Sequence, residues 1–374
     1  MEKIYTKETE KQLIWREKME NQNYNVYKNI MSVNPIIDIS YIRHILQLSK
    51  RQVVSNIEIN EVIESNTALV IKATIQINSG NDENKKIFIK TIKSNQSENV
   101  YRNQSIQEGN FYKIIKESAI SNIPIPLCYD VFVSEKKEEF VIVLEDISQK
   151  YIAPDNTIIT NENIWFSCVE SLAQFHSALW NNELIFKNFE QTEHDFQQDR
   201  DCLQSFLKDF EYEFDDKTKI VLKRAMELNI KLIKDTQQRI IDQSNVTICN
   251  GDSHIFNFML PVENGDKLLI VDFQFWGEGI GTGDLAHLTR VNFSDDLKNK
   301  IQLPLIEHYH KSLLANGVKG YTWENCLKDY RMSVASMVLI PLWQYAGFGI
   351  KYEKWYKDLK GLVFNYEFLK CNEI

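Results

Sequence analysis

Between residues 57 and 145 the hydrophobic positions recur mainly with a period of two, interrupted by one helical segment, and after residue 145 they recur mainly with a helical period. The clearest alternation is in residues 71–77, where isoleucine or alanine stands at every second position between lysine, threonine and glutamine. A period of two predicts a half-buried strand. Further strands are predicted from near residue 57 and over 86–92, 128–134 and 140–144. With a helix predicted over 104–118, these segments indicate a five-stranded antiparallel sheet that carries one helix.

After residue 148 the apolar residues lie mainly at helical spacing. One helix face is formed by Trp165, Val169, Leu172, Ala173, His176 and Leu179. No carboxylate or cysteine stands at metal-ligand spacing from His176, so we interpret it as a buried structural histidine. The pattern predicts an α+β protein with a small antiparallel β lobe, residues 1–147, and a large, mainly helical lobe, residues 148–374.

Two apolar runs, 256–260 and 268–273, flank a strong turn signal at Asn264-Gly265. Asn-Gly between apolar runs favours a two-residue hairpin turn, because both turn residues need positive φ. Such a turn places Asn257 directly across from Asp272, with Cβ atoms about 5 Å apart. An amide oxygen and a carboxylate suit Mg²⁺, which takes hard oxygen ligands and shares its shell with substrate phosphates. The sequence therefore predicts a metal site at Asn257 and Asp272.

Asp252 stands five residues before Asn257, directly after a short apolar strand and a glycine. The spacing Asp-x-x-x-x-Asn, followed by a second aspartate at a strand end, is the catalytic arrangement of the kinase fold. There the first aspartate orients the acceptor hydroxyl, and the other two residues hold the metal that bridges the nucleotide phosphates. The alternative is a plain hairpin with solvated polar ends.

Residues 246–290 resemble the aminoglycoside phosphotransferase and choline kinase family, whose pattern is His-Gly-Asp-x-x-x-x-Asn followed by a strand ending in Asp. The likeness is greatest to the ecdysteroid-kinase-like branch and its bacterial relatives. The resemblance implies a two-lobed protein-kinase-like fold and an ATP- and Mg²⁺-dependent kinase that phosphorylates a hydroxyl of a small molecule, with Asp252 as catalytic residue. Asn250 stands where the family usually has His, and it can still make a hydrogen bond that organises the loop.

The glycine-rich run 277–283 leads to Asp284, which we expect to cap a helix beginning at Leu285. This run lacks the Gly-Lys-Ser/Thr ending of a Walker loop. The family has a similar Gly-Asp before a helix, and there the aspartate braces the catalytic loop. The resemblance therefore makes Asp284 a structural residue.

The resemblance also assigns nucleotide contacts to the first lobe. The turn at Ser65-Asn66 stands where the family covers the phosphates, although it has no glycine here, and an ordinary β-turn is the alternative. The segment Leu144, Glu145 and Asp146 stands at the family's hinge, where backbone groups bond the adenine edge.

Lys90 ends the strand over 86–92, where a kinase lysine pairs the phosphates and is held by a glutamate of the next helix. The expected glutamate is Glu108, which shares a helix face with the apolar Phe111, Tyr112 and Ile115. A carboxylate on an apolar face needs a partner, and Lys90 is our prediction for it. Lys93 is the rival, and an exposed lysine with a surface glutamate is the alternative.

The composition of the chain limits the kinds of partner and of cellular compartment that we expect for it. The chain has 374 residues, 43% of them hydrophobic and 25% charged, as is usual for a folded protein. A net charge of −9 argues against a nucleic-acid partner, which needs a basic footprint. Scattered cysteines without a Cys-x-x-Cys pair indicate free thiols in a reducing cytoplasm, and no apolar run is long enough for a membrane span. The oligomeric state is left open.

Several functions remain compatible with these residues. The first is the small-molecule kinase, and an antibiotic-modifying phosphotransferase is one form of it. The second is a kinase-like protein that holds nucleotide without transferring phosphate, motivated by Asn250 and the glycine-free turn. The third is a helical scaffold without a nucleotide site. A protein kinase fits less well, because Asp284 follows Asp272 too closely for an activation loop and no Ala-Pro-Glu follows.

Overall fold

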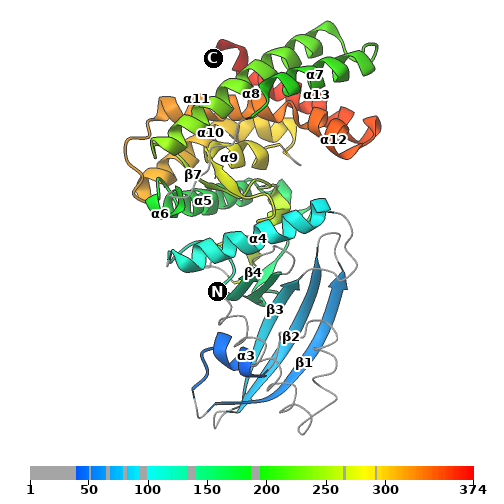
Figure 1. The fold of residues 1–374 in the computed structure, drawn as a ribbon. Helices are drawn as coiled ribbons and strands as arrows, with labels where there is room; N and C mark the ends of the chain where they lie inside the picture. The colour runs from blue at the N-terminus through cyan, green and yellow to red at the C-terminus, as the bar shows by residue number, and fades with distance from the viewer. Residues whose placement is uncertain are drawn as a thin grey trace, which may run out of the picture. The chain divides into compact units, whose positions relative to one another are not determined.

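The computed structural model describes residues 39–49, 52–64, 68–78, 82–91, 99–118, 120–133, 140–186, 194–263, 267–290 and 293–374. Backbone contacts divide the chain into two compact units (Figure 1). The first comprises the chain up to Gly109 together with Leu127–Asp146, and the second comprises Asn110–Pro126 and Ile147–Ile374. The first carries a large antiparallel sheet, and the second consists mostly of helices, which confirms the predicted α+β class.

The sheet of the first unit has five antiparallel strands in the order β1-β2-β3-β5-β4. They are β1 (Val53–Glu64), β2 (Leu69–Asn78), β3 (Asp82–Thr91), β4 (Cys128–Val133) and β5 (Phe140–Glu145). The alternation of residues 71–77 has its predicted meaning, because Ile71, Ala73, Ile75 and Ile77 are all buried. The five strands and the accompanying helix, α4 (Asn99–Glu117), are confirmed.

The two faces of this sheet differ. On one face Ile42 and Ile45 of α3 (Ile39–Ile45) belong to one buried cluster with the apolar residues of β2, β3 and β5. Ile87 and Ile89 of β3 face this cluster, so Lys90, the next residue of the strand, points to the opposite face. There it meets α4 through Glu108.

Nine α-helices lie wholly within the described part of the second unit. They are α5 (Glu162–Ala178), α6 (Glu183–Phe186), α7 (Phe196–Asp209), α8 (Asp216–Ile241), α9 (Thr282–Leu288), α10 (Asp295–Ala315), α11 (Trp323–Met337), α12 (Ile340–Phe348) and α13 (Tyr352–Phe368). The predicted apolar face of α5 is buried, with Trp165, Val169 and Leu172 at 0% exposure. This helix packs chiefly on α10 and supports the short strand β7 (Thr247–Cys249).

Short strands of the second unit position its polar loops. β8 (Phe258–Pro261) pairs with β6 (Tyr151–Ile152) and with β9 (Leu269–Ile270), while β10 (Gly277–Gly279) pairs with β7. The apolar face predicted beside Glu108 is also buried, because the ring of Phe111 stacks on Phe273 with centroids 3.8 Å apart. The residue after Asp272 is thus anchored in the core.

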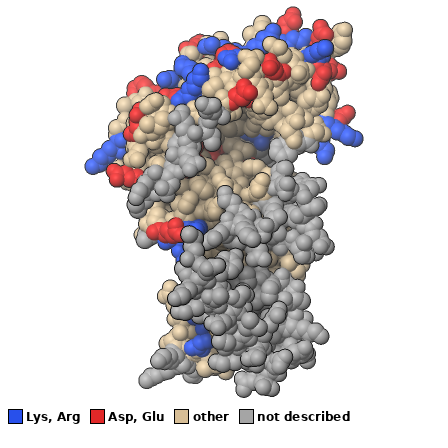
Figure 2. Space-filling model, in the orientation of Figure 1, with Lys and Arg blue, Asp and Glu red and all other residues tan. Residues whose placement is uncertain are grey.

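The distribution of charged side chains and the state of the cysteines are those expected from the composition of the chain. Figure 2 shows acidic and basic side chains interspersed over the described surface of the helical unit. All six cysteines are free thiols, as predicted. Within the described ranges, every helix is too short or too polar to serve as a membrane span.

Candidate active site

The loop after β7 can form only with glycine at its second position. Gly251 has φ +83°, and a Cβ there would lie 2.0 Å from the carbonyl oxygen of Phe275. Both the left-handed backbone and the close approach exclude a side chain. Gly251 thus lets the chain turn directly before Asp252.

This steric limit gives a stability prediction. Gly251→Ala should lower the free energy of unfolding by about 2 kcal/mol or more, the sum of positive-φ strain and a backbone clash. Gly283→Ala is the matched control, because a Cβ on Gly283 would meet nothing within 4 Å; this position lies in α9, where alanine is the better helix former. Denaturant unfolding of both variants measures the difference, and equal stabilities would contradict the assigned loop geometry.

Asn250 fastens the loop that carries Asp252. It is fully buried, and its Nδ2 donates to the backbone oxygen of Asp272 over 2.8 Å. Its Oδ1 accepts from the backbone N–H of Asp252 over 3.1 Å and from the Ser253 hydroxyl over 3.3 Å. Asparagine therefore connects the Asp252 loop to the segment that carries Asp272.

Asp284 braces the same loop from α9. Its carboxylate accepts from the N–H groups of Asn250 (2.6 Å) and Gly251 (2.9 Å) and from Nε2 of His176 (3.1 Å). Burial alone would raise the pKa of Asp284, but His176 and the two backbone donors bring it below its ordinary value. The predicted bracing role is supported, whereas the predicted cap is wrong. The helix begins at Thr282 with Gly281 as its N-cap, so Asp284 lies inside the first turn and faces the loop.

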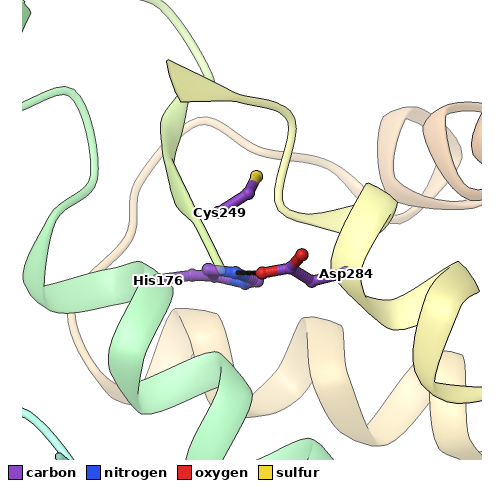
Figure 3. Close-up of side chains that lie close together, drawn as sticks. All are labelled: His176, Cys249 and Asp284. Atoms are coloured by element: carbon purple, nitrogen blue, oxygen red, sulfur yellow. Dashed lines mark hydrogen bonds and ion pairs between the residues drawn. The ribbon is translucent and has the colours of Figure 1, made fainter. Parts of the chain in front are cut away.

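His176 is the structural histidine that the sequence predicts. Its ring is fully buried, and Nδ1 lies 2.7 Å from the Tyr309 hydroxyl. Nε2 is bonded to Asp284 (Figure 3). Cys249 lies beside this pair, close enough for the three side chains to suggest a metal site. Both ring nitrogens are already engaged, and burial raises the pKa of the Cys249 thiol well above its ordinary value. The cluster therefore suits a hydrogen-bonded brace better than a metal centre.

The carboxylate of Asp252 lies between two imidazoles. Its Oδ1 is 3.3 Å from Nε2 of His287, and its Oδ2 is 3.6 Å from Nε2 of His254. The side chain is 29% exposed, so a substrate can reach it. Burial raises the pKa of Asp252; His254 works against the rise and the charge of Asp272 adds to it. A partly desolvated carboxylate with a raised pKa suits proton transfer.

The predicted hairpin register is wrong by one residue. β8 and β9 pair Phe258 with Ile270, and the N–H of Val271 donates to the oxygen of Asn257 over 2.9 Å. Asn257 therefore lies across from Val271 and not from Asp272. The turn at residues 264–266, on which the register was based, lies outside the described residues.

The backbone departs from strand geometry at both predicted metal ligands. Asn257 ends a 3-10 turn, Ile255–Asn257, and Asp272 has φ +62°. In a regular strand, an error of one residue in the register would place the side chain on the opposite face of the sheet. This rule does not apply to Asn257 and Asp272, because neither residue has a regular strand conformation. Asn257 Nδ2 donates to the backbone oxygen of Asp252 over 2.8 Å, which leaves Oδ1 as its candidate ligand atom. The metal role of the pair remains a prediction.

Asp272 offers one direct observation on the fit of a cation. Its Oδ1 is buried and has no hydrogen-bond partner among the described residues. Buried polar atoms in folded proteins are nearly always bonded, and an orphaned one calls for an unseen ion or water. A carboxylate oxygen with this environment fits a divalent cation.

Lys90 and Glu108 form the predicted ion pair within the first unit. Lys90 Nζ is in direct contact with Glu108 Oε2, and the side chains are only 12% and 5% exposed. The rival Lys93 lies outside the described residues, as do Ser65 and Asn66. At the predicted hinge, the N–H of Glu145 donates to the backbone oxygen of Leu127, and the N–H of Asp146 donates to that of Lys86. Binding of adenine by Leu144, Glu145 and Asp146 stays a prediction.

The ion pair should support the first unit's stability. Glu108→Gln removes the charge that compensates Lys90, and we expect a loss of about 1–3 kcal/mol in unfolding free energy. Glu117→Gln is the control, since Glu117 is 67% exposed and pairs only loosely with Lys113 at 4.0 Å. Such surface changes stay within about 0.5 kcal/mol. Equal effects of the two variants on the unfolding midpoint would show that the Glu108 pair contributes no more than a surface contact.

Three residues near Asp252 escaped the sequence analysis, namely His254, His287 and Arg290. His287 follows Asp284 by three residues, a spacing that keeps both side chains on one side of α9, and Arg290 lies just beyond the end of that helix. Arg290 bonds Asp358 of α13, and its Nη2 lies 3.4 Å from Nε2 of His287. The spacing was visible in the sequence, but nothing local indicated that this side of α9 faces Asp252.

A cavity of about 220 Å³ lies next to the loop. Its lining includes Leu232 and Thr236 of α8, Met337 of α11, Gly251 and the ring of His287. His287 therefore has Asp252 on one side and an open space on another.

Comparison with known proteins assigns the fold. The family model for the ecdysteroid kinase-like family matches residues 62–319. A microcompartment-associated aminopropanol kinase superposes with a TM-score of 0.50 and 12% identity over 89% of this chain and 97% of that one. A protein from Ralstonia eutropha described as a candidate aminoglycoside phosphotransferase gives 0.50 and 12% over 88% and 96%. These likenesses establish the kinase-like fold alone, as predicted. No curated protein sequence matches the chain.

Proposed function

The chain belongs to the ecdysteroid kinase-like family, and on that premise we propose that it is an ATP- and Mg²⁺-dependent kinase that phosphorylates a hydroxyl of a small molecule. The observation that carries the proposal is the placement of Asp252. Its loop is fixed by Asp284 from one side and by Asn250 from the other, while its carboxylate stays partly exposed with a raised pKa.

In the proposed reaction each residue has a separate task. Asp252 orients the acceptor hydroxyl and takes its proton as the oxygen attacks the γ-phosphorus and ADP leaves. Lys90, held by Glu108, binds the phosphates. Asn257 and Asp272 would hold Mg²⁺, which supplies positive charge against the phosphates when bound. The backbone N–H groups of Asn250, Gly251 and Asp252 are bonded to side chains of the protein, and these bonds hold the loop in place.

The test is ATP consumption with a panel of hydroxyl-bearing metabolites that includes amino alcohols, aminoglycosides and sterols. We expect ADP formation that depends on Mg²⁺ and rises with one class of acceptor. An acceptor among the aminoglycosides would make the protein an antibiotic-modifying phosphotransferase. Absence of ADP formation with every acceptor, combined with a thermal shift by ATP, would favour a kinase-like nucleotide-binding protein. Absence of the shift as well would favour a scaffold.

The proposed location of the protein is the cytoplasm. Free thiols and a nucleoside triphosphate substrate fit this reducing compartment. The acidic net charge of −9 suits a small-molecule partner better than a nucleic acid.

A further inference from the structure

A larger cavity, of about 500 Å³, lies elsewhere in the helical unit, where α7 and α11 pack on α8. This volume is within the range of about 300–1,000 Å³ that is usual for small-molecule sites. Four basic and two acidic side chains line it, namely Arg200, Lys231, Lys234, Lys328, Glu227 and Asp235. The lining therefore has a net charge of +2, although the whole chain has a net charge of −9.

The larger cavity is separate from the one beside the catalytic loop. Leu232 and Thr236 of α8 line the smaller cavity, whereas Lys231 and Lys234 line the larger one. At 3.6 residues per turn, Lys234 lies about 200° around the helix from Leu232. No described residue lines both cavities. The charged cavity therefore lies outside the proposed active site.

The two carboxylates of the larger cavity already have arginine partners. Arg200 donates to Glu227 from Nε and from Nη2, both over 3.1 Å. Arg239 lies 2.8 Å from Asp235 and also bonds the buried Asp329. The acidic groups of the lining are thus held by arginines and not by its lysines.

The three lysines of the lining have no such partner. Among the described residues, no carboxylate lies within 4.0 Å of the ammonium group of Lys231, Lys234 or Lys328. Lys234 Nζ lies 4.9 Å from the ring centroid of Phe196, a contact that orients the ammonium group without neutralising it. Lys231 and Lys234 are three residues apart on one helix, where like charges repel each other. A bound anion would therefore stabilise this lining.

We propose that this cavity binds a small phosphomonoester, with its phosphate among the ammonium groups of Lys231, Lys234 and Lys328. A phosphomonoester carries about 1.5 to 2 negative charges at neutral pH and three strong acceptor oxygens. These properties match the net charge of the lining and its three lysine donors. The cavity of about 500 Å³ leaves room beyond a single phosphate for the organic part of the ligand. The inference does not depend on the proposed kinase activity, because the site is a different one.

Isothermal titration calorimetry tests the site with phenyl phosphate as the probe, at about pH 8, where the phosphate is a dianion. We expect saturable binding that weakens as NaCl is added, because salt screens exposed charges. Benzoate, which has the same ring and one negative charge, should bind about fivefold more weakly. Absence of saturable phenyl phosphate binding up to about 10 mM would overturn the proposal, and so would equal binding of the two probes.

Lys231→Gln and Lys328→Gln test whether the probe binds in this cavity. Both lysines are exposed and lie in helices, and glutamine has a similar helix propensity, so the variants should fold. Each should weaken phenyl phosphate binding about three- to fivefold, the effect of one exposed ion pair, and the double variant should weaken it about tenfold or more. Unchanged affinity in the double variant would place the probe at another site and contradict the proposal.

Lys311→Gln is the matched control. Lys311 is 73% exposed on α10 and does not line the cavity, and its substitution removes the same single charge. Phenyl phosphate should bind this variant as tightly as the unmutated protein. An equal loss in Lys311→Gln and in the cavity variants would show that the probe responds only to the net charge of the chain, and the proposed site would be wrong.

Phosphatidic acid presents the same chemical group at a membrane surface. Because the lysines line a cavity, we expect the protein not to sediment with phosphatidylcholine vesicles that contain phosphatidic acid. Sedimentation that the double variant abolishes, without binding of phenyl phosphate, would assign the lysines to a lipid surface and overturn the proposal. Calorimetry needs no turnover of ATP, so a chain that transfers no phosphate contradicts the proposed function, and the binding measurements still decide this inference.

Discussion

Asp272→Ala is expected to abolish Mg²⁺-dependent turnover of ATP and to leave the protein folded. The buried Oδ1 of Asp272 has no hydrogen-bond partner among the described residues, so its removal breaks no such bond there. Loss of a metal ligand, in contrast, removes charge stabilisation of roughly 4 kcal/mol from the transition state. At about 1.4 kcal/mol per factor of ten, turnover should fall by about 10³-fold.

Thermal shifts measure the metal contribution directly. The unmutated protein should be stabilised more by ATP with Mg²⁺ than by ATP alone, because a ligand that binds only the native state raises the unfolding midpoint. Asp272→Ala should lose this Mg²⁺ increment. Asp272→Asn is the matched variant, since asparagine tolerates the φ of +62° and removes only the charge. If both variants keep the increment, the metal is held by other residues.

The sequence predicted the sheet and its ion pair correctly because both depend on local periodicity. Alternation in residues 71–77 places Ile71 and Ile75 on one face whatever the tertiary context, and both are buried. The same reasoning put Glu108 on the apolar side of its helix, where a buried carboxylate requires a cation. Lys90 is the cation that the sequence predicts as the partner of Glu108, and the two side chains are in contact.

The hairpin prediction failed because it treated the polar ends as regular strand. Asn257 ends a 3-10 turn and Asp272 has a left-handed backbone. Both departures depend on contacts made by distant residues, such as the bond from Asn250 Nδ2 to the Asp272 oxygen. A register predicted by counting residues from the turn does not take such contacts into account. The predicted pairing is therefore wrong by one residue.

The surroundings of Asp252 were hidden for a related reason. Capping rules treat Asp284 as serving its own helix, but its carboxylate is bonded to the loop at Asn250 and Gly251. Once Asp284 faces the loop, the three-residue spacing brings His287 to the same place. The sequence contains the spacing, and only the tertiary fold gives its direction.

Asp252→Asn should separate chemistry from nucleotide binding. The substitution keeps the shape of the side chain and removes its ability to accept a proton. The raised pKa of Asp252, caused first by burial, makes the carboxylate a stronger base than an exposed aspartate, so its loss should be felt in the proton-transfer step. Turnover should fall by about 10²-fold or more, the usual effect of losing a general base.

The loss should appear in kcat, because Asp252 meets the acceptor hydroxyl and not the nucleotide. ATP affinity and its Mg²⁺ dependence, measured by calorimetry, should stay near the unmutated values. Asp242→Asn provides the control, since Asp242 is an exposed residue at the end of α8 and its substitution should change neither quantity. If Asp252→Asn loses ATP binding and Mg²⁺ dependence together, Asp252 is a metal or folding residue. If turnover of a true acceptor is unchanged, the catalytic role assigned to Asp252 is wrong, because the reaction then proceeds without a carboxylate at this position to accept the hydroxyl proton.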